Sequence, residues 1–207
     1  MAITGFFMGK NTKNTTAKER MLKKIRQALL QKRDNPFPHF QDTPLYAPID
    51  DPLTVLFAER FTENGGHFVY CESELHMMES LLGLIEQKEL RKIHVWEPGL
   101  QEIMTRYGLP FIKTDAGVDE GLTGIDLGIT SCEALIGRMG AVMLGNANSS
   151  GRRLSRLAST HVVLVGSQQI LPDIKDGMDY LKQKYKSALP SSVQLLSKDV
   201  YVFILDY

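Results

Sequence analysis

The chain has 207 residues, 43% of them hydrophobic, which is enough for one compact domain with a buried core. Lys plus Arg and Asp plus Glu both number 24, and a net charge of zero makes nucleic acid and anionic membranes poor partners. The longest aliphatic run, Val162 to Val165, is far shorter than the roughly 20 residues that span a bilayer.

The chain contains two cysteines, Cys71 and Cys132, and no apolar run precedes a small-residue cleavage site near its start. Both features favour the reducing cytoplasm. Two thiols cannot supply the four ligands of an iron–sulfur cluster or of a closed zinc site. The five histidines lack the spacing of metal ligands. We therefore expect no metal and no cofactor in this chain alone.

Before the expected main domain, the sequence predicts a mobile start (residues 1–14) and then a helix. Thr16 and Glu19 have the spacing of a capping box, and Met21, Ile25 and Leu29 recur every fourth residue. This pattern predicts an amphipathic helix that ends near residue 33.

An extended arm follows the helix, because five of the nine prolines fall between Pro36 and Pro52. Residues 15–52 therefore form a helix and a proline-rich arm. The apolar stripe of the helix needs a cover, which its own domain or another subunit could provide. An arm of this length can reach a neighbouring subunit, so an oligomer is one expectation.

Residues 53–207 are predicted to form an α/β domain in which helices and strands alternate. The first helix lies between Asp51-Pro52 and Asn64-Gly65-Gly66, and Ser73 should cap a second helix with Leu75, Met78, Leu82 and Ile85 on one face. Strands are predicted at 67–71, 93–96, 111–112, 126–130, 141–144, 161–165 and 201–205, and further helices at 98–107, 133–138, 152–158 and 172–185. The alternation indicates a parallel-dominated sheet flanked by helices.

Common catalytic signatures are missing, including the glycine-rich nucleotide motifs and His-Glu-x-x-His. The loop from Gly145 to Gly151 is instead built of small and amide residues and leads into a predicted helix. Backbone amides and an arginine there could hold a carboxylate or phosphate, although a plain surface loop has the same composition. The residues assigned to this anion site are Gly145, Asn146, Asn148, Ser149, Gly151, Arg152 and Arg153.

A second group of candidates lies where a strand ends, at Thr130, Ser131, Cys132 and Glu133. Ligands usually bind at this edge of a parallel sheet. Glu133 could act as a base or nucleophile, and a thiol at a helix N-terminus can become reactive. Ser131 could equally be a helix cap, with Glu133 placed by the helix dipole and Cys132 packed in the core. His161 either begins a strand as an ordinary core residue or faces the same crevice.

The order of several short segments resembles the lactate-utilisation protein C family, whose central block defines the LUD domain. The match covers about residues 120–185 and rests on Leu127-Gly128-Ile129-Thr130-Ser131-Cys132-Glu133, Ile136, Gly140, Gly151-Arg152-Arg153-Leu154 and His161-Val-Val-Leu-Val165. Residues 25–29 and 61–69 resemble the family more loosely.

The resemblance implies a fold similar to the sugar-phosphate isomerase and CoA-transferase group. It also implies a role in the oxidation of L-lactate to pyruvate beside iron–sulfur partner subunits, which would hold the clusters. The family usually has an acidic residue and threonines where this sequence has Arg138, Met139 and Ala141. It also has paired prolines where this sequence has Ser159-Thr160. The Gly-Pro-Ser-x-Thr-x-Asp-Ile-Glu segment is missing, which indicates a divergent member with a shortened C-terminus.

Three functions remain compatible with the sequence. The chain could be a subunit or accessory factor of lactate oxidation that binds a small anionic metabolite. It could be an enzyme that acts on a phosphorylated or CoA-linked metabolite. It could also be a binding or scaffold subunit without chemistry.

Overall fold

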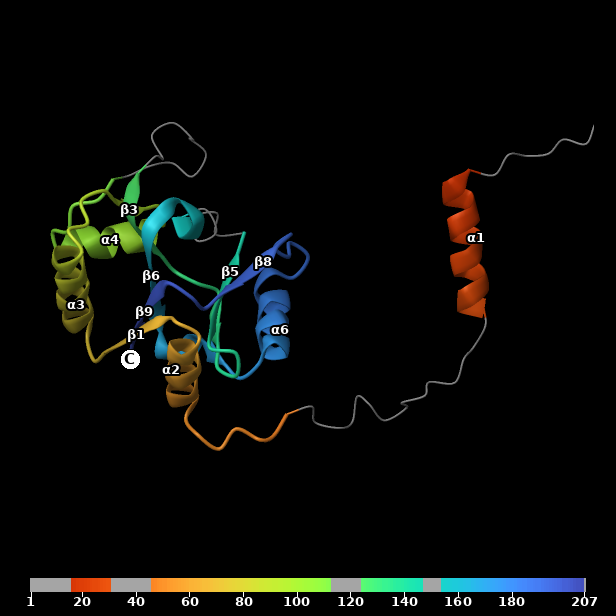
Figure 1. Ribbon diagram of the computed structural model, residues 1–207, viewed down its shortest axis with the longest axis horizontal. Coiled ribbons are helices and arrows are strands. Elements are labelled where there is room, and N and C mark those ends of the chain that lie inside the picture. Colours follow the sequence, from red (N-terminus) through yellow and green to blue (C-terminus); the bar gives the residue numbers. More distant parts are fainter. Residues whose placement is uncertain (1–15, 31–45, 113–123, 147–153, 207) are drawn as a thin grey trace, which may run out of the picture. The chain divides into compact units, whose positions relative to one another are not determined.

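The computed structural model describes residues 16–30, 46–112, 124–146 and 154–206 (Figure 1). Contacts divide the chain into two units, Met1–Ala47 and Pro48–Tyr207. In the first unit, helix α1 spans Ala17–Leu30. The predicted capping box forms: the Thr16 amide donates to Glu19 Oε2 at 2.9 Å, and the Glu19 amide donates to Thr16 Oγ1 at 3.3 Å. Residues 1–15 and 31–45 lie outside the described residues.

The second unit is built on a five-stranded sheet in which every neighbouring pair is parallel, as predicted. The strand order is β1-β9-β6-β3-β2. The strands are β1 (His67–Cys71), β2 (Ile93–Val95), β3 (Ile125–Thr130), β6 (Ala158–Gly166) and β9 (Val200–Leu205). Because all five run in one direction, their carboxyl ends share one edge of the sheet. Residues 111–112, predicted as a strand, form only an isolated bridge between Ile112 and His94.

Helices α3 (Glu74–Gln87) and α4 (Pro98–Arg106) pack in one core cluster with side chains of β3, β6 and β9 (Figure 1). Ser73 caps α3 as predicted, since its Oγ accepts a hydrogen bond from the His76 amide at 3.1 Å. The predicted buried face of α3 was wrong in part, because Leu75 and Leu82 are exposed. The face toward the sheet is made by Met77, Met78, Leu81 and Leu84.

A second, smaller sheet contains four strands in the order β7-β4-β5-β8. They are β4 (Ala134–Ile136), β5 (Ala141–Gly145), β7 (Ile170–Leu171) and β8 (Val193–Leu196). The helix predicted at 133–138 was therefore wrong. Three apolar residues are too few to define a helical face, and they pair antiparallel with β5 instead. Strands β7 and β8 were not predicted.

The hairpin between β4 and β5 is packed tightly against α2 (Leu53–Glu63), a helix that the sequence predicted. Gly140 has φ +54°, and a Cβ there would lie 2.3 Å from the backbone of Arg60 and Phe61. The side-chain amide of Asn64 donates to the Met139 carbonyl at 2.7 Å. Only glycine permits this approach of turn and helix.

The small sheet lies between the parallel sheet and helix α6 (Ile174–Tyr185) (Figure 1). Leu135 and Val142 pack in a core cluster with Val163 of the parallel sheet, and Ile136 and Met143 pack with Leu181 of α6. The sequence placed the start of α6 at Pro172, but Asp173 is its N-cap. Residues 154–157 are helical, within the helix predicted at 152–158. The resulting layers place the ends of β3 and α6 close together.

Candidate functional site

The carboxyl end of β3 leads into a cluster of polar groups around the buried Glu133. Thr130 ends β3, and Ser131 to Glu133 connect it to β4. Because no helix follows, the interpretation of Ser131 as a helix cap fails, and so does the helix-dipole argument for Cys132 and Glu133. The Ser131 amide instead donates to Glu97 Oε1 at 3.0 Å.

Glu133 is 1% exposed, yet its carboxylate has two side-chain donors. Lys184 Nζ lies 2.8 Å from Oε2, and the Tyr185 hydroxyl lies 2.8 Å from Oε1. Lys184 and Tyr185 occupy the last turn of α6, so helix packing brings them to a residue about fifty positions earlier. A buried carboxylate needs such partners, because burial without them is costly.

The two donors are tuned by their surroundings. Partial burial lowers the pKa of Lys184, but the hydrogen bond and charge of Glu133 outweigh this and leave that pKa above its usual value. Burial, followed by the hydrogen bond and charge of Glu133, raises the pKa of Tyr185. Lys184 is therefore a cation and Tyr185 a neutral phenol at physiological pH. The Lys184 side chain is 38% exposed, so solvent can reach this end of the cluster.

Gly145, one of the predicted anion-site residues, directly adjoins Glu133. A Cβ at Gly145 would lie 2.8 Å from Glu133 Oε1, so glycine leaves room for the carboxylate. The next residue, Asn146, uses its side chain inside the fold: Nδ2 donates to Ser191 Oγ at 2.7 Å and Oδ1 accepts from the Ser192 amide at 3.3 Å. The other predicted residues of this loop, Asn148, Ser149, Gly151, Arg152 and Arg153, lie outside the described residues.

Thr130, three residues before Glu133, forms a buried pair with His161. Thr130 Oγ1 and His161 Nε2 are 2.8 Å apart, on the adjacent strands β3 and β6. Both residues are almost completely buried, and burial lowers the pKa of His161 to about 4. Nδ1 of His161 has no hydrogen-bond partner among the described residues. His161 is therefore a neutral imidazole with an unused ring nitrogen.

Cys132 lies between these groups but has the properties of a core residue. It is 4% exposed and packs with the apolar side chains between the two sheets. Burial, followed by the charges of Glu133 and Glu97, raises the pKa of the Cys132 thiol far above its usual value. These surroundings disfavour the thiolate that nucleophilic attack requires.

Sequence reasoning placed Thr130, Ser131, Glu133, Gly145 and His161 in the site, and the structure puts all five on or just after β3, β5 and β6. It missed Glu97, Lys184 and Tyr185. Nothing in the sequence around residues 184–185 marks them, because only the path of α6 over the small sheet brings them to Glu133. These three residues join the site only through the way the helices and strands pack in the fold.

Over residues 16–30, 46–112, 124–146 and 154–206, no group of three or more His, Cys, Asp or Glu could hold a metal ion. No helix in those ranges is long and apolar enough to cross a membrane. The described groups of the site are a buried carboxylate, an ammonium group, a phenol and a neutral imidazole.

Comparisons with known proteins agree with this architecture. The family model of the LUD domain matches residues 55–199. The fold is similar to the crystal structure of a DUF162 family protein from Deinococcus radiodurans, with 17% sequence identity and a TM-score of 0.59 over 75% of this chain and 96% of that one. At this identity the likeness shows the fold alone. Curated protein sequences give no match.

Proposed function

The chain belongs to the LUD-domain family, and from this premise we propose that it takes part in the oxidation of L-lactate to pyruvate. In this proposal it is a subunit or accessory factor that binds a small anionic metabolite. The observation that supports it most is the cluster of Glu133, Lys184 and Tyr185 at the carboxyl edge of the parallel sheet. Ligands of open α/β sheets bind at this edge.

Lys184 is the group that would recognise the anion. Its ammonium has three donor hydrogens, and the bond to Glu133 uses one of them. With 38% of its side chain exposed, it can offer the others to a carboxylate that arrives from solvent. The predicted loop residues Asn148, Ser149, Gly151, Arg152 and Arg153 follow Gly145, which touches Glu133, and would supply further donors.

His161 is proposed to position the metabolite or to accept a proton from it. Oxidation of lactate removes two electrons and two protons. One proton comes from the C2 hydroxyl, and the hydrogen on C2 leaves together with the two electrons to an acceptor that the partner subunits would supply. A base for that proton must be neutral before the reaction, and burial keeps the imidazole of His161 in this state. Thr130 holds the ring through Nε2, and Nδ1, which is buried and has no partner among the described residues, is the nitrogen that would take the proton.

The two electrons must leave the chain, and iron–sulfur partner subunits are proposed to take them. Cys71 and Cys132 pack in different hydrophobic cores, so their thiols cannot bind the same iron–sulfur cluster. This placement supports the proposal that the iron–sulfur clusters would be held by partner subunits rather than by this chain. The helix and arm of residues 15–52 are proposed to help hold such an assembly, or a homo-oligomer, together.

A second candidate function is favoured by the geometry of Glu133 alone. The Glu133 carboxylate, held by Lys184 and Tyr185 beside Gly145, could attack the carbonyl carbon of a thioester or acyl phosphate. An acyl–glutamate anhydride would form, and the bond to the leaving thiolate or phosphate would break. The substrate would then be a CoA-linked or phosphorylated metabolite. This chemistry needs no partner subunit, which separates it from lactate oxidation.

Ligand-induced stabilisation tests the proposal. L-lactate, pyruvate, a sugar phosphate and CoA would each be added to the purified chain while its thermal midpoint is measured. A metabolite at about one hundred times its Kd should stabilise the fold by about 2.7 kcal/mol. Lactate and pyruvate are expected to do so, and a Lys184→Met variant should lose most of the effect.

Lys182→Met is the matched control. Lys182 lies on the same helix and also pairs with a carboxylate, Asp179, at 2.7 Å, but on the exposed surface. It should keep the wild-type response. Stabilisation by CoA but not by lactate or pyruvate would favour the second candidate, and no response to any of the four would contradict an anion site.

A further inference from the structure

Helix α1 carries an exposed apolar stripe. Met21, Ile25 and Leu29 recur every fourth residue, so they share one face of the helix and form the α1 stripe. No residue of α1 is buried, and Leu29 exposes 78% of its surface. A helix of 14 residues is only marginally stable in water without a partner for its apolar face. The α1 stripe therefore needs a docking surface.

The charge around this stripe is positive. Helix α1 has five basic residues and one acidic residue, a formal charge of +4. Lys24 and Arg26 flank Ile25 in the chain, so they lie on either side of the α1 stripe. Lys18 lies about one turn before Met21. A partner that fits this face combines apolar contacts with carboxylates around them.

Helix α3 presents a stripe of the complementary kind. Its inner face packs on the parallel sheet (Figure 1), yet Leu75 and Leu82 are exposed on its outer face. Glu79 and Glu86 follow these leucines at a spacing of four, so all four residues share one side of the helix and form the α3 stripe. Helix α3 contains three glutamates and neither lysine nor arginine. Its charge is thus opposite to that of α1.

The two glutamates of the α3 stripe are available to a partner. Glu79 and Glu86 are exposed and form no ion pair in the part of the chain that the structure describes. The third glutamate of the helix, Glu74, is instead bound by Arg106 at 3.1 Å and by the Tyr107 hydroxyl at 3.3 Å. Carboxylates beside exposed leucines select a basic apolar partner through charge complementarity.

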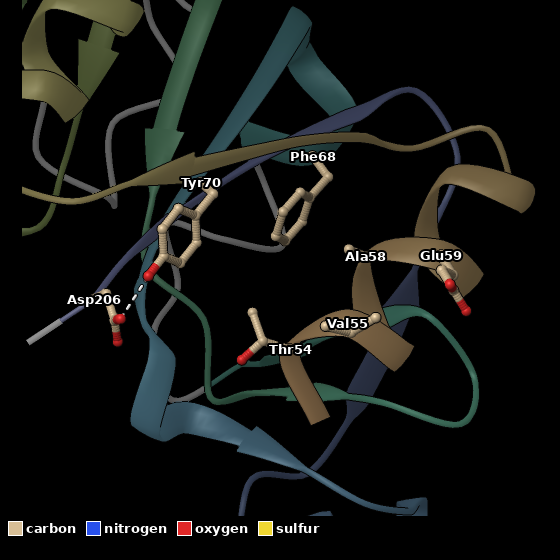
Figure 2. Close-up of a pocket in the computed structure, with 7 residues that line it drawn as sticks. All are labelled: Thr54, Val55, Ala58, Glu59, Phe68, Tyr70 and Asp206. Carbon is tan, nitrogen blue, oxygen red and sulfur yellow. Dashed lines mark hydrogen bonds between the residues drawn. The ribbon is translucent and has the colours of Figure 1, made fainter. Parts of the chain in front are cut away.

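A second exposed apolar surface lies between α2 and β1 and fits α1 less well. Figure 2 shows its apolar side chains, which include Val55 and Phe68. Asp206 there already accepts a hydrogen bond from the Tyr70 hydroxyl (Figure 2), which leaves Glu59 as the other carboxylate. This surface therefore offers less charge to a helix of +4 than the α3 stripe, which has two exposed glutamates.

We propose that the α1 stripe of one copy of this chain docks on the α3 stripe of a second copy. The leucines of α3 would pack against the apolar side chains of α1, and Glu79 and Glu86 would pair with Lys24 and Arg26. Each copy provides one α1 stripe and one α3 stripe, so reciprocal docking closes as a dimer with twofold symmetry.

The sequence between α1 and α2 favours a second copy over the same chain as the partner. This segment has 22 residues, 31–52, and five of them are prolines. Proline-rich sequences extend by about 3.1 Å per residue and act as semi-rigid spacers, which favours contact with a neighbour over a sharp return. The proposal makes specific the assembly role given to residues 15–52 and does not depend on lactate oxidation.

Light scattering of the full chain after size exclusion tests the proposal, and its readout is mass rather than metabolite binding. The wild type is expected to be a dimer of about twice 23.3 kDa with a Kd below about 10 µM. Lys24→Glu with Arg26→Glu should weaken the dimer at least about tenfold, and so should Glu79→Lys with Glu86→Lys, because each change turns attraction into repulsion. All four side chains are exposed, so these variants should remain folded, which circular dichroism checks.

A mixture of the two charge-reversed chains separates docking between copies from docking within one chain. In the mixture each reversed α1 meets a reversed α3 stripe, so the dimer should return. Docking within one chain would not be restored by mixing.

Two controls change charge elsewhere on the surface. Arg20→Glu with Lys23→Glu makes the same charge change on the opposite face of α1 and should remain a dimer. Glu59→Lys alters the surface between α2 and β1 and should also remain a dimer. A wild type that is monomeric at about 100 µM, whether or not it binds anionic vesicles, would overturn the proposal. So would a mixture that stays monomeric, or a control that loses the dimer as fully as the α1 and α3 variants.

Discussion

The carboxyl edge of the parallel sheet holds carboxylates in two contrasting environments. Glu133, after β3, is 1% exposed and is neutralised by Lys184 with help from Tyr185. Asp206, after β9, is exposed and accepts hydrogen bonds from the hydroxyls of Tyr70 and Ser167. A buried carboxylate requires an internal cation, whereas water screens an exposed one. Burial, rather than position at the edge, therefore decides whether a carboxylate there needs a cation inside the fold.

The largest effect is expected from Lys184→Met. This change leaves the Glu133 carboxylate buried without its cation and should lower the free energy of unfolding by about 3 kcal/mol. Lys182→Met removes only an exposed pair and should cost less than about 0.5 kcal/mol. Urea unfolding measures both. If the double variant Glu133→Gln with Lys184→Met regains much of the loss, the charge pair is the cause; equal losses in the two lysine variants would contradict the account.

A smaller effect is expected from pH at the buried end. Burial lowers the pKa of His161 from 6.5 to about 4 in the folded chain, so the unfolded chain binds this proton first as pH falls. The stabilisation from His161 is complete above pH 6.5 and is lost as pH falls toward 4. Between pH 7 and 4.5 the loss should be about 2 kcal/mol.

The comparison with His161→Gln isolates this contribution from the acidic groups that titrate in the same range. Urea unfolding at pH 7, 5.5 and 4.5 should show a pH dependence that is shallower in the variant by about the same 2 kcal/mol. Parallel curves for the two proteins would show that His161 is not held neutral.

The smallest effect compares two tyrosines that each donate to a carboxylate. Tyr185→Phe removes a donor from buried Glu133 and should cost about 1.5 kcal/mol. Tyr70→Phe removes a donor from exposed Asp206, which water can replace, and should cost less than about 0.5 kcal/mol. Thermal unfolding of both variants checks the ranking. A larger loss in Tyr70→Phe would reverse the contrast between the two ends of the edge.

The sequence predicted the parallel sheet because its strands are continuous apolar runs, such as Val162 to Val165 in β6, separated by helices with clear caps. It did not predict the small sheet. Ala134 to Ile136 is too short an apolar run to distinguish a strand from a helix. The spacing of Gly137 and Gly140 between two apolar segments was the available sign of a hairpin, and Gly140 indeed has a positive φ.

The candidate site was most predictable where a strand ends. Thr130 ends β3, and Ser131 and Glu133 follow it directly, so their position at the sheet edge followed from the strand itself. Lys184 and Tyr185 reach Glu133 through the packing of α6 on the small sheet, and Gly177 permits that packing because a Cβ there would lie 2.6 Å from Met143. Such contacts depend on topology, which local sequence patterns do not specify.

The most direct test of the central claim is a calorimetric titration of pyruvate into the wild-type chain, Lys184→Met and Lys182→Met. The account predicts that Lys184→Met loses pyruvate binding and that Lys182→Met keeps the wild-type Kd, because only the first lysine lies against the buried Glu133 carboxylate. Unchanged binding in Lys184→Met, or an equal loss in both lysine variants, would contradict the account.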